Sequence, residues 1–468
     1  MDIVARWTER LERFFLFYLF ANPVLDIVNG AYLYTMKQLG VRQPAWLAAL
    51  SPTLLLRIGV LGLMCCFILI LRDHKTILNL MLIFTAALLS VYGEVFFSMR
   101  YGLFYDAQYI ARFLYNIAAL TVYSALSRGR CGREGMRLLM RRAFTWSALI
   151  ISGSIIVCFI LSSVLPIKIG FYTYMDRFGL RGASGFYIAA NEAVAILMLL
   201  LPVTFSDFFE AGGFKDRKNW PRLVAPALII NAMLLVGTKT AFVALFAGLA
   251  FVVAYQLRQA VKKKNRIIYR RLGQAAALTA ALFLVLAFFG MANSLLGTLG
   301  AFSDIFGEED QSFEHIEDED RRNALLNANP IVRLLLSGRE YYMMRGADLW
   351  SQNYFTAVFG IGRGSQLKVI EMDFFEILFY YGAFGFAVML FPYARKVRRL
   401  YRNLRGKGSL LVWSVMLGLL LTAGYAFIAG HVAFSVTGGF YFILMLVYGD
   451  MLLSDGEKAE EDTLCTES

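Results

Sequence analysis

Residues 222–257 read RLVAPALIINAMLLVGTKTAFVALFAGLAFVVAYQL, and this stretch decides the fold class. Its two apolar runs, 222–238 and 240–257, each approach the roughly 20 residues that a helix needs to cross a bilayer. Only a short Gly-Thr-Lys-Thr segment around Lys239 separates them. Runs this long and continuous predict helices, because a chain in lipid must satisfy its backbone hydrogen bonds internally. We therefore expect a transmembrane helical hairpin with Lys239 at its tip.

The composition extends this interpretation to the whole chain of 468 residues. Hydrophobic residues make up 58% and charged residues 17%, whereas an average soluble domain is about 45–50% apolar and about 25% charged. This composition excludes a disordered chain, which has low hydrophobicity, and argues against a soluble multidomain enzyme. The five cysteines have no C-x-x-C spacing, so they indicate neither a zinc site nor a disulfide framework.

Similar apolar runs recur along the chain and predict an all-α polytopic membrane protein with about twelve transmembrane helices. The predicted spans are 14–34, 51–71, 76–97, 106–126, 144–165, 185–206, 222–238, 240–257, 273–291, 370–393, 409–429 and 433–453. The first run continues past Asn22 and Pro23 without a small-residue cleavage site. We therefore expect it to be an uncleaved span and not a signal peptide.

The positions of the basic residues predict the orientation of these spans. With the N-terminus inside, the inner segments hold 30 of the 46 Lys and Arg residues, and the short outer loops hold seven. Because positive residues collect on the cytoplasmic side, both termini are predicted to be cytoplasmic. The net charge of +12 is thus mainly a topology signal, and it does not indicate a nucleic-acid partner.

One predicted outer segment, residues 292–369, is long, and loops of this length are usually functional or disordered. The part from Asp304 to Asp320 holds nine acids and is expected to be a solvated turn, with cation attraction as the alternative. The part from Arg339 to Trp350 has an amphipathic pattern that favours a helix on the membrane surface. The chain therefore divides into helices one to five (1–165), helices six to nine with an arginine-bearing outer loop (166–291), the long loop (292–369), helices ten to twelve (370–453) and an acidic cytoplasmic tail (454–468).

Ionisable residues inside the bilayer are expensive and mark sites by default. The predicted spans contain Asp26, Arg57, Glu94, Arg112 and Glu192. We expect the first four to form structural contacts such as acid–arginine pairs that lock two helices together. Glu192 lies near an outer helix end, which favours a functional role.

The predicted outer face carries few basic residues, so each is informative. Arg177 and Arg181 directly precede span six, Lys239 lies at the hairpin tip, and Arg339 and Arg345 lie in the long loop. The planar guanidinium of arginine suits phosphate and diphosphate oxygens. If these cations converge, they form an anion pocket at lipid-headgroup depth. The alternative for any single one is snorkelling to the interface.

A glycine-rich segment, GIGRG at 360–364, and two carboxylates follow. The glycines have neither the spacing nor the strand context of a dinucleotide-binding fingerprint. Glu371 and Asp373 lie where the long loop enters span ten, in position for a general base acting on an incoming hydroxyl. His431, at the outer end of span eleven, is a further candidate.

These segments resemble the superfamily of O-antigen ligases and Wzy-type polysaccharide polymerases. The resemblance covers about residues 170–390 and rests on four short motifs in order. The first is an arginine, a glycine and a helix-opening asparagine (Arg181, Gly182, Asn191), and the second is a Gly-Ser-Arg-Thr type hairpin (237–240, with Lys239 for arginine). The third is a Gly-Arg pair with a later G-x-G (Gly338, Arg339, 360–362). The fourth is a histidine separated by ten residues from a glycine (Glu371 in place of the histidine, and Gly382).

The resemblance implies a GT-C-like bundle in the bacterial cytoplasmic membrane, acting on undecaprenyl-diphosphate-linked glycans at the outer face, with no nucleotide sugar, cofactor or metal. It implies that Arg181, Arg339 and Lys239 hold the diphosphate, and that Glu371, or Asp373 beside it, deprotonates the acceptor. The expected partners are the lipid-linked oligosaccharide, a glycan acceptor, membrane lipids and envelope polysaccharide-assembly proteins. Further candidates for substrate contact are Arg177, Asn191, Glu192, Arg345, Arg363 and His431.

Three alternatives for the function stay open from the sequence. A polymerase of capsule, exopolysaccharide or teichuronic-type glycans is favoured over a ligase, because the histidine that Glu371 replaces is prominent among ligases. A flippase for lipid-linked sugars also fits the number of spans, although the two halves of the chain show no repeat of the kind that transporters have. After a glycosyltransferase and a flippase, the third alternative is a non-catalytic subunit of the envelope machinery.

Overall fold

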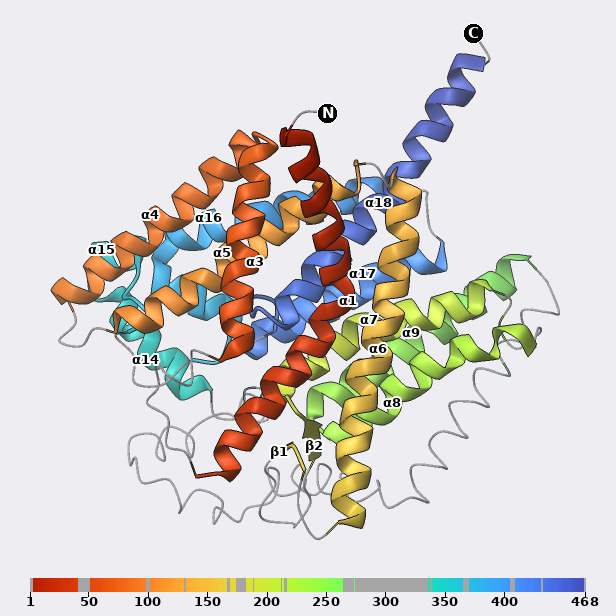
Figure 1. Ribbon diagram of the computed structural model, residues 1–468, viewed down its shortest axis with the longest axis horizontal. Helices are drawn as coiled ribbons and strands as arrows, with labels where there is room; N and C mark the ends of the chain where they lie inside the picture. Colours follow the sequence, from red (N-terminus) through yellow and green to blue (C-terminus); the bar gives the residue numbers. More distant parts are fainter. Residues whose placement is uncertain are drawn as a thin grey trace.

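The computed structural model describes fifteen stretches of the chain. These are residues 3–40, 51–97, 102–129, 132–165, 169–173, 182–187, 189–211, 213, 217–263, 273, 336, 339–364, 370–404, 409–430 and 432–466. The helices are α1 (Ile3–Gln38), α3 (Pro52–Ile70), α4 (His74–Phe97), α5 (Leu103–Leu126), α6 (Gly132–Val164), α7 (Ala190–Glu210), η3 (Arg217–Leu223), α8 (Val224–Val236), α9 (Lys239–Lys263), α14 (Glu340–Ser351), α15 (Tyr354–Phe359), α16 (Asp373–Asn403), α17 (Leu410–Ile428) and α18 (Gly438–Thr466). Figure 1 shows their arrangement.

The structure confirms an all-α polytopic membrane protein. Within the described residues, nine helices are long and apolar enough to cross a membrane, and the apolar part of α18, Gly438–Leu453, is a shorter candidate. Helix α5 corresponds to the predicted span 106–126, which carries Asp106 and Arg112. The ninth predicted span, 273–291, lies outside the described residues, so the count of twelve stays a prediction.

Several helices extend beyond the predicted spans, and the extensions are basic. Helix α6 begins at Gly132 and not at residue 144, and α16 continues to Asn403, ten residues past its predicted end. Lys and Arg are good helix formers, and their long side chains reach water from a helix end. Hydropathy therefore detects only the lipid-facing part of each helix. The predicted acidic tail also continues a helix, because α18 runs to Thr466.

Helix α7 forms the centre of the bundle. Its residues from Ala193 to Phe209 are all buried, which is the pattern of a helix surrounded by protein on every side. Helices α6, α8, α9, α17 and α18 contact it. At the contact with α17, a side chain on Gly418 would lie 3.0 Å from the carbonyl oxygen of Leu199. A small residue is needed there for two backbones to approach this closely.

A two-stranded antiparallel sheet, β1 (Phe171–Thr173) with β2 (Gly182–Gly185), precedes α7. The sequence had predicted no strand, and it had begun span six at Gly185. Strand β2 is buried and contacts α6 and α8. Gly185 has a φ of +61°, and a side chain there would lie 3.1 Å from the backbone of Ile155. The residue thus ends the strand against α6, and the helix starts five residues later.

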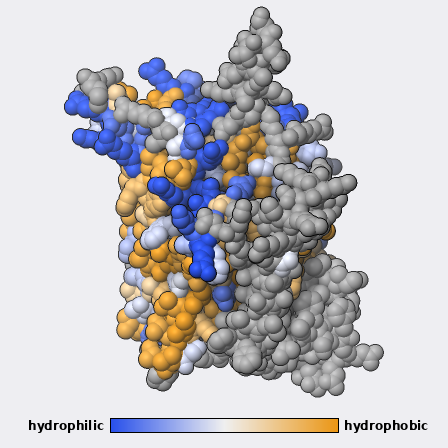
Figure 2. All heavy atoms as spheres, turned by 90° about the vertical axis from the view of Figure 1, so that its right-hand side faces the viewer, coloured by the Kyte–Doolittle hydropathy of each residue, from blue (hydrophilic) through white to orange (hydrophobic). Residues whose placement is uncertain are grey.

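The two ends of the bundle differ in what they carry. Both termini lie at one end, whereas the β-sheet and α14 lie toward the other (Figure 1). Hydrophilic atoms gather near the end with the termini, and hydrophobic atoms cover much of the side below (Figure 2). Placing both termini on one side agrees with the predicted topology; the assignment of that side to the cytoplasm stays a prediction.

Two of the predicted intramembrane charges form a structural pair of the predicted kind. Arg57 of α3 and Asp26 of α1 are ion-paired, and both are buried. The hydroxyl of Thr437 donates to Asp26 Oδ1 at 3.0 Å. Three segments far apart in the sequence are thus joined by one buried polar cluster, as is expected where a charge must be paired inside a membrane.

Candidate active site

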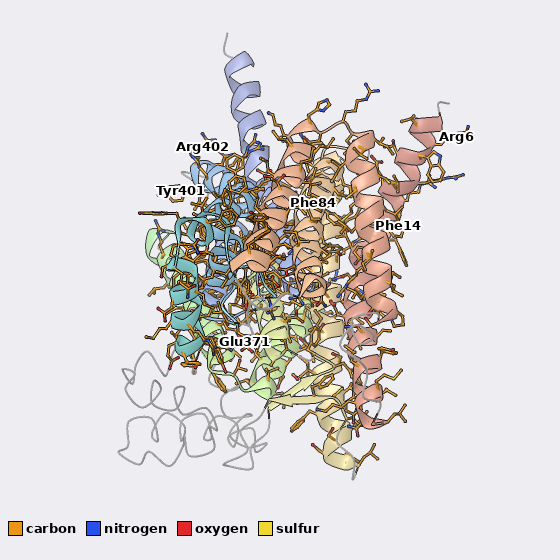
Figure 3. All side chains as sticks on the ribbon, turned by 90° about the vertical axis from the view of Figure 1, so that its left-hand side faces the viewer. Arg6, Phe14, Phe84, Glu371, Tyr401 and Arg402 are labelled. Carbon is orange, nitrogen blue, oxygen red and sulfur yellow. The ribbon has the colours of Figure 1, made fainter. Side chains whose placement is uncertain are left out.

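The candidate site lies at the start of α16, away from the basic end of the bundle that carries Arg6 and Arg402 (Figure 3). Glu371 has a φ of +58°, the left-handed region that non-glycine residues seldom adopt. Its backbone N–H donates to the buried carboxylate of Glu376 at 2.8 Å. On the other side, a side chain on Gly430 would lie 2.7 Å from the Glu371 backbone. Strained residues of this kind cluster at functional sites because their surroundings over-determine them.

Arg339 is the partner of Glu371. Its Nε lies 3.4 Å from Glu371 Oε2, with 20% of the arginine and 40% of the glutamate side chain exposed. The arginine precedes the first residue of α14, and its Nη1 donates to the carbonyl of Leu336 at 3.3 Å. Helix α14 itself confirms the amphipathic stretch that was predicted from Arg339 to Trp350. Two predicted site residues that are 32 positions apart are therefore in contact and open to a ligand.

Asp373, the other predicted catalytic carboxylate, has a different environment. It is 3% exposed, and its Oδ2 accepts from the backbone N–H groups of Val432 and Ala433 at 3.0 and 2.7 Å. Its own backbone N–H donates to the carbonyl of Ala429. A buried carboxylate that binds two backbone amides fixes a loop, so we infer a positioning role for Asp373 and leave the base role to Glu371.

Sequence reasoning missed Glu376. Its carboxylate is buried and holds the backbone of Glu371 in place. The spacing of five residues offered only a weak signal, an acid in the first turn of a helix, which is a common feature that favours the helix dipole.

Asn191 lies where three predicted motifs meet. The hydroxyl of Tyr425 in α17 donates to Asn191 Oδ1 at 2.6 Å. Tyr425 also interacts with Thr240 at the α8–α9 hairpin and electrostatically with Arg339. Gly237 closes α8 with a φ of +64°, the left-handed cap that allows α9 to begin two residues later, at Lys239. The side chain of Lys239 is outside the described part of the structure.

A second group of charges lies deeper between the helices. Arg112 of α5 interacts electrostatically with Glu192 of α7, with Arg363 and with Asp373. Glu192 in turn forms a side-chain hydrogen bond with Ser435. The guanidinium carbon of Arg363 lies 5.5 Å from the ring centre of Tyr380. Glu192 and Arg363, two predicted substrate contacts, thus belong to one charged network that reaches Asp373.

The other predicted site residues are less informative. Arg345 is exposed on α14. Arg177, Arg181 and His431 lie outside the described residues, so their predicted roles stay predictions. Their chain neighbours are described: β2 begins at Gly182, and Gly430 and Val432 contact the backbone of Glu371 and the carboxylate of Asp373.

The GIGRG segment at 360–364 is a structural device and not a nucleotide loop. Helix α16 is kinked at Gly382, which has φ +67° and ψ −176°. The kink frees two carbonyls of the preceding turn, and these accept from the N–H groups of Ile361 and Gly362 at 3.0 and 3.1 Å. A side chain on Gly382 would lie 2.3 Å from the backbone of Val358. One close contact between two backbones therefore explains both the G-x-G at 360–362 and the glycine at 382.

Carboxylates from α4 and α5 hold the far end of this segment. Glu94 accepts from the N–H groups of Gly102 at 2.6 Å and Gly364 at 3.1 Å. Asp106 accepts from the N–H of Arg363 at 2.7 Å. Glu94 was predicted as a structural residue and its contacts are structural, although its partners are backbone amides and the side chain of Asp106 and not an arginine.

The comparison with known families agrees with this geometry. The family model described as "O-antigen ligase like membrane protein" matches residues 8–455. The chain belongs to this O-antigen ligase like family. The match extends beyond residues 170–390, where the motifs had suggested the resemblance, and it includes α1 to α6. Among curated proteins, none matches the chain. Membership in the O-antigen ligase like family supports a membrane glycosyltransferase-type function that acts on lipid-linked glycans.

Proposed function

We propose that this O-antigen ligase like protein transfers or polymerises undecaprenyl-diphosphate-linked glycans at the outer face of the bacterial cytoplasmic membrane. The observation that carries the proposal is the partly exposed pair of Arg339 and Glu371, with Nε and Oε2 3.4 Å apart. One group can bind an anionic leaving group, and the other can accept a proton. Tyr425 interacts electrostatically with Arg339 and donates a hydrogen bond to Asn191, a residue of the family motifs.

In the proposed reaction, an acceptor hydroxyl oxygen attacks the anomeric carbon of the donor glycan. The new carbon–oxygen bond forms as the bond from that carbon to the diphosphate breaks, and the diphosphate leaves with the bonding electrons. Arg339 and, as the resemblance implies, Arg181 and Lys239 stabilise its developing charge. Fixed cations aimed at such charge are among the largest contributions to catalysis.

Glu371 takes the proton of the acceptor hydroxyl and later releases it to water. Its contact with Arg339 couples this step to donor binding. Because the diphosphate competes with the Glu371 carboxylate for the guanidinium, donor binding frees that carboxylate for the acceptor. The backbone bond from Glu371 to Glu376 and the bonds that anchor Asp373 to residues 432 and 433 keep the base in place.

Between the two reactions open to this site, we favour polymerisation over transfer to a different acceptor, because Glu371 stands where ligases of this family carry a histidine. The test is product sizing after purified protein is incubated with the short lipid-linked repeat unit. A ladder of products supports a polymerase. A single transfer to an added acceptor, without a ladder, supports a ligase.

The same assay with Arg339→Gln and Arg339→Lys examines the site itself. Lysine keeps the charge but not the planar fork, so we expect the KM for the donor to rise in both variants and more in glutamine. Arg6→Gln, at the opposite end of the bundle, serves as the control. Product formation at the wild-type rate in both Arg339 variants would refute the assignment, and movement of the lipid-linked glycan across vesicles without any change in its length would favour a flippase.

A further inference from the structure

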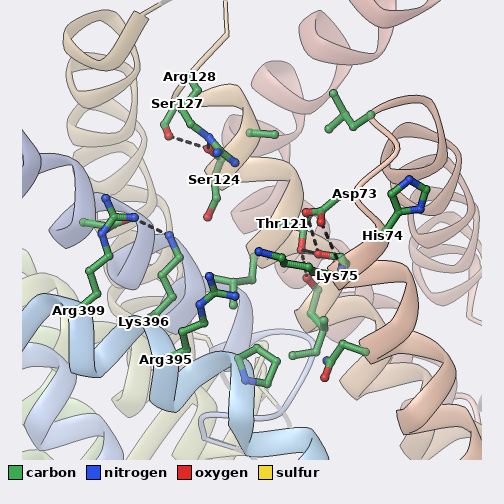
Figure 4. Close-up of a pocket in the computed structure, with 18 of the residues that line it drawn as sticks. Asp73, His74, Lys75, Thr121, Ser124, Ser127, Arg128, Arg395, Lys396 and Arg399 are labelled. Atoms are coloured by element: carbon green, nitrogen blue, oxygen red, sulfur yellow. Dashed lines mark hydrogen bonds and ion pairs between the residues drawn. The ribbon is translucent and has the colours of Figure 1, made fainter.

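A large cleft lies at the end of the bundle that carries both termini (Figure 4), and Arg402, which lines it, is far from Glu371 (Figure 3). Its volume is about 1430 Å³. Its walls come from the turn between α3 and α4, the end of α5, the start of α6, the basic extension of α16, and Asp450 and Met451 of α18. Nothing in the proposed reaction uses this cleft.

The lining of the cleft is strongly cationic. Eight Lys and Arg residues line the cleft, against three acids, Glu12, Asp73 and Asp450. The cations are Arg72, Lys75, Arg128, Arg133, Arg395, Lys396, Arg399 and Arg402. Bringing like charges together costs Coulomb energy unless counter-charges lie between them.

The acids of the cleft compensate only part of this charge. Asp450 pairs with Lys396 at 2.6 Å and Arg399 at 3.2 Å. The carboxylate of Asp73 instead binds the backbone N–H and the hydroxyl of Thr76, at 3.3 and 3.0 Å, and so begins α4. Lys75 and Arg395 extend toward the same space from opposite sides (Figure 4). The cleft therefore has an excess of positive charge that an anion would neutralise.

Part of the remaining lining is apolar and exposed. Leu71, Leu78 and Leu82, from the C-cap of α3 and from α4, and Phe391 of α16 line the same cleft, and they are 40%, 58%, 37% and 62% exposed. On a bundle that spans a membrane, exposed apolar side chains face lipid tails. The cleft is thus cationic where it reaches the membrane surface and apolar where it enters the bilayer.

We propose that this cleft binds the phosphate headgroup of an acidic membrane lipid, with the acyl chains against α4 and α16. The two-part lining matches the two parts of such a lipid, whereas a free phosphate would need only the cationic part. Basic pockets between membrane helices are a known way to bind acidic headgroups. The site holds α4, α5, α16 and α18 together at the end opposite the proposed active site. It is independent of the proposed function.

The test measures the affinity of the purified full chain for phosphatidylglycerol and phosphatidylcholine, by retention of each lipid in native mass spectrometry during titration in detergent. We compare wild type with the double variant Lys75→Gln/Arg395→Gln. The control is Arg6→Gln/Arg398→Gln, which removes the same charge from exposed residues that do not line the cleft. Each basic side chain near an acidic headgroup contributes about fivefold, so we expect about 25-fold weaker binding of phosphatidylglycerol in the cleft variant and less than threefold in the control.

Three outcomes would overturn the proposal. One is equal affinity of the wild type for the two lipids, and another is an equal loss in the cleft variant and the control. The third comes from a parallel titration with glycerol phosphate, the headgroup without chains: if it binds as tightly as the lipid and is lost in the same variant, the cleft is an anion site and not a lipid site. Retention of the wild-type elution volume in size-exclusion chromatography shows that the cleft variant is folded.

Discussion

Two of the acid–arginine pairs in the described part of the protein have surroundings that differ. Arg57 and Asp26 lie between α1 and α3, with 9% and 2% of their side chains exposed, and Thr437 closes the pair. Arg339 and Glu371 lie at the start of α14 and α16, with 20% and 40% exposed. The same two chemical groups thus serve as a helix lock in one place and as a candidate reaction centre in the other. Access for a ligand, and not residue type, makes the difference.

The largest expected effect is on the partly exposed pair of Arg339 and Glu371, called the open pair below. Glu371→Gln should lower kcat by about 10²- to 10⁴-fold, because a positioned general base contributes about that much. The thermal unfolding temperature should change by little, since the side chain is partly exposed. The measurement is the initial rate of product formation on the lipid-linked repeat unit, with exposed Asp348→Asn on α14 as the control. A Glu371→Gln enzyme that works at the wild-type rate would show that another group is the base.

The buried pair of Arg57 and Asp26, the closed pair, should respond in the opposite way. Arg57→Met leaves Asp26 buried without its cation, and breaking a buried pair costs about 3–5 kcal/mol of unfolding free energy. Unfolding in detergent measures this loss, while activity per folded molecule should stay near wild type. The double variant Asp26→Asn/Arg57→Met should recover part of the stability. If activity fell without a loss of stability, the distinction between the two pairs would be wrong.

The glycine segment that leads to the open pair should be sensitive to a single methyl group. In Gly362→Ala the new Cβ would lie 2.3 Å from Glu94 Oε2, at a φ of +72°. The strained conformation alone costs about 1–2 kcal/mol, so we expect lower stability and lower activity together. Gly62→Ala is the matched control, because no atom lies within 4 Å of its Cβ and the residue is inside helix α3. There alanine should be neutral or stabilising by up to about 1 kcal/mol.

The smallest expected effect is at the edge of the open site. Tyr425→Phe removes the 2.6 Å hydrogen bond to Asn191, which is worth about 1 kcal/mol. The KM for the donor should rise by about fivefold, with a similar rise in Asn191→Ala. In a double-mutant cycle the two changes should be less than additive, because they remove the same bond. Full additivity would mean that the two residues act separately.

The sequence predicted most of the helices, because a helix that crosses a membrane is a local property of about twenty residues. Helix α3 was predicted as 51–71 and is Pro52–Ile70, and α17 was predicted as 409–429 and is Leu410–Ile428. The β1–β2 sheet was missed because two short strands carry little periodicity. The ends of α6 and α16 were missed because charged helical turns outside the lipid leave no hydropathy signal.

The candidate site was predicted only as a set of residues. Arg339 and Glu371 were both named, but the sequence left open whether Glu371 or Asp373 is the base, because both are carboxylates at the start of one span. Burial separates them: Asp373 binds backbone amides of residues 432 and 433, and no pattern within 370–376 can reveal a partner sixty residues away. Glu376 was missed for the same reason, since its role depends on the left-handed backbone of Glu371.

Hydropathy and charge along the chain determined that this is a helical membrane protein, which runs are apolar enough to cross the membrane, and which cations were worth following. Those properties depend on neighbouring residues and on the difference in free energy between water and lipid. The folded structure decided which charges meet, which carboxylate is open, and why glycines stand at 360, 362 and 382, where two backbones make close contact. These depend on long-range packing, in which a few tenths of an ångström separate a contact from a clash.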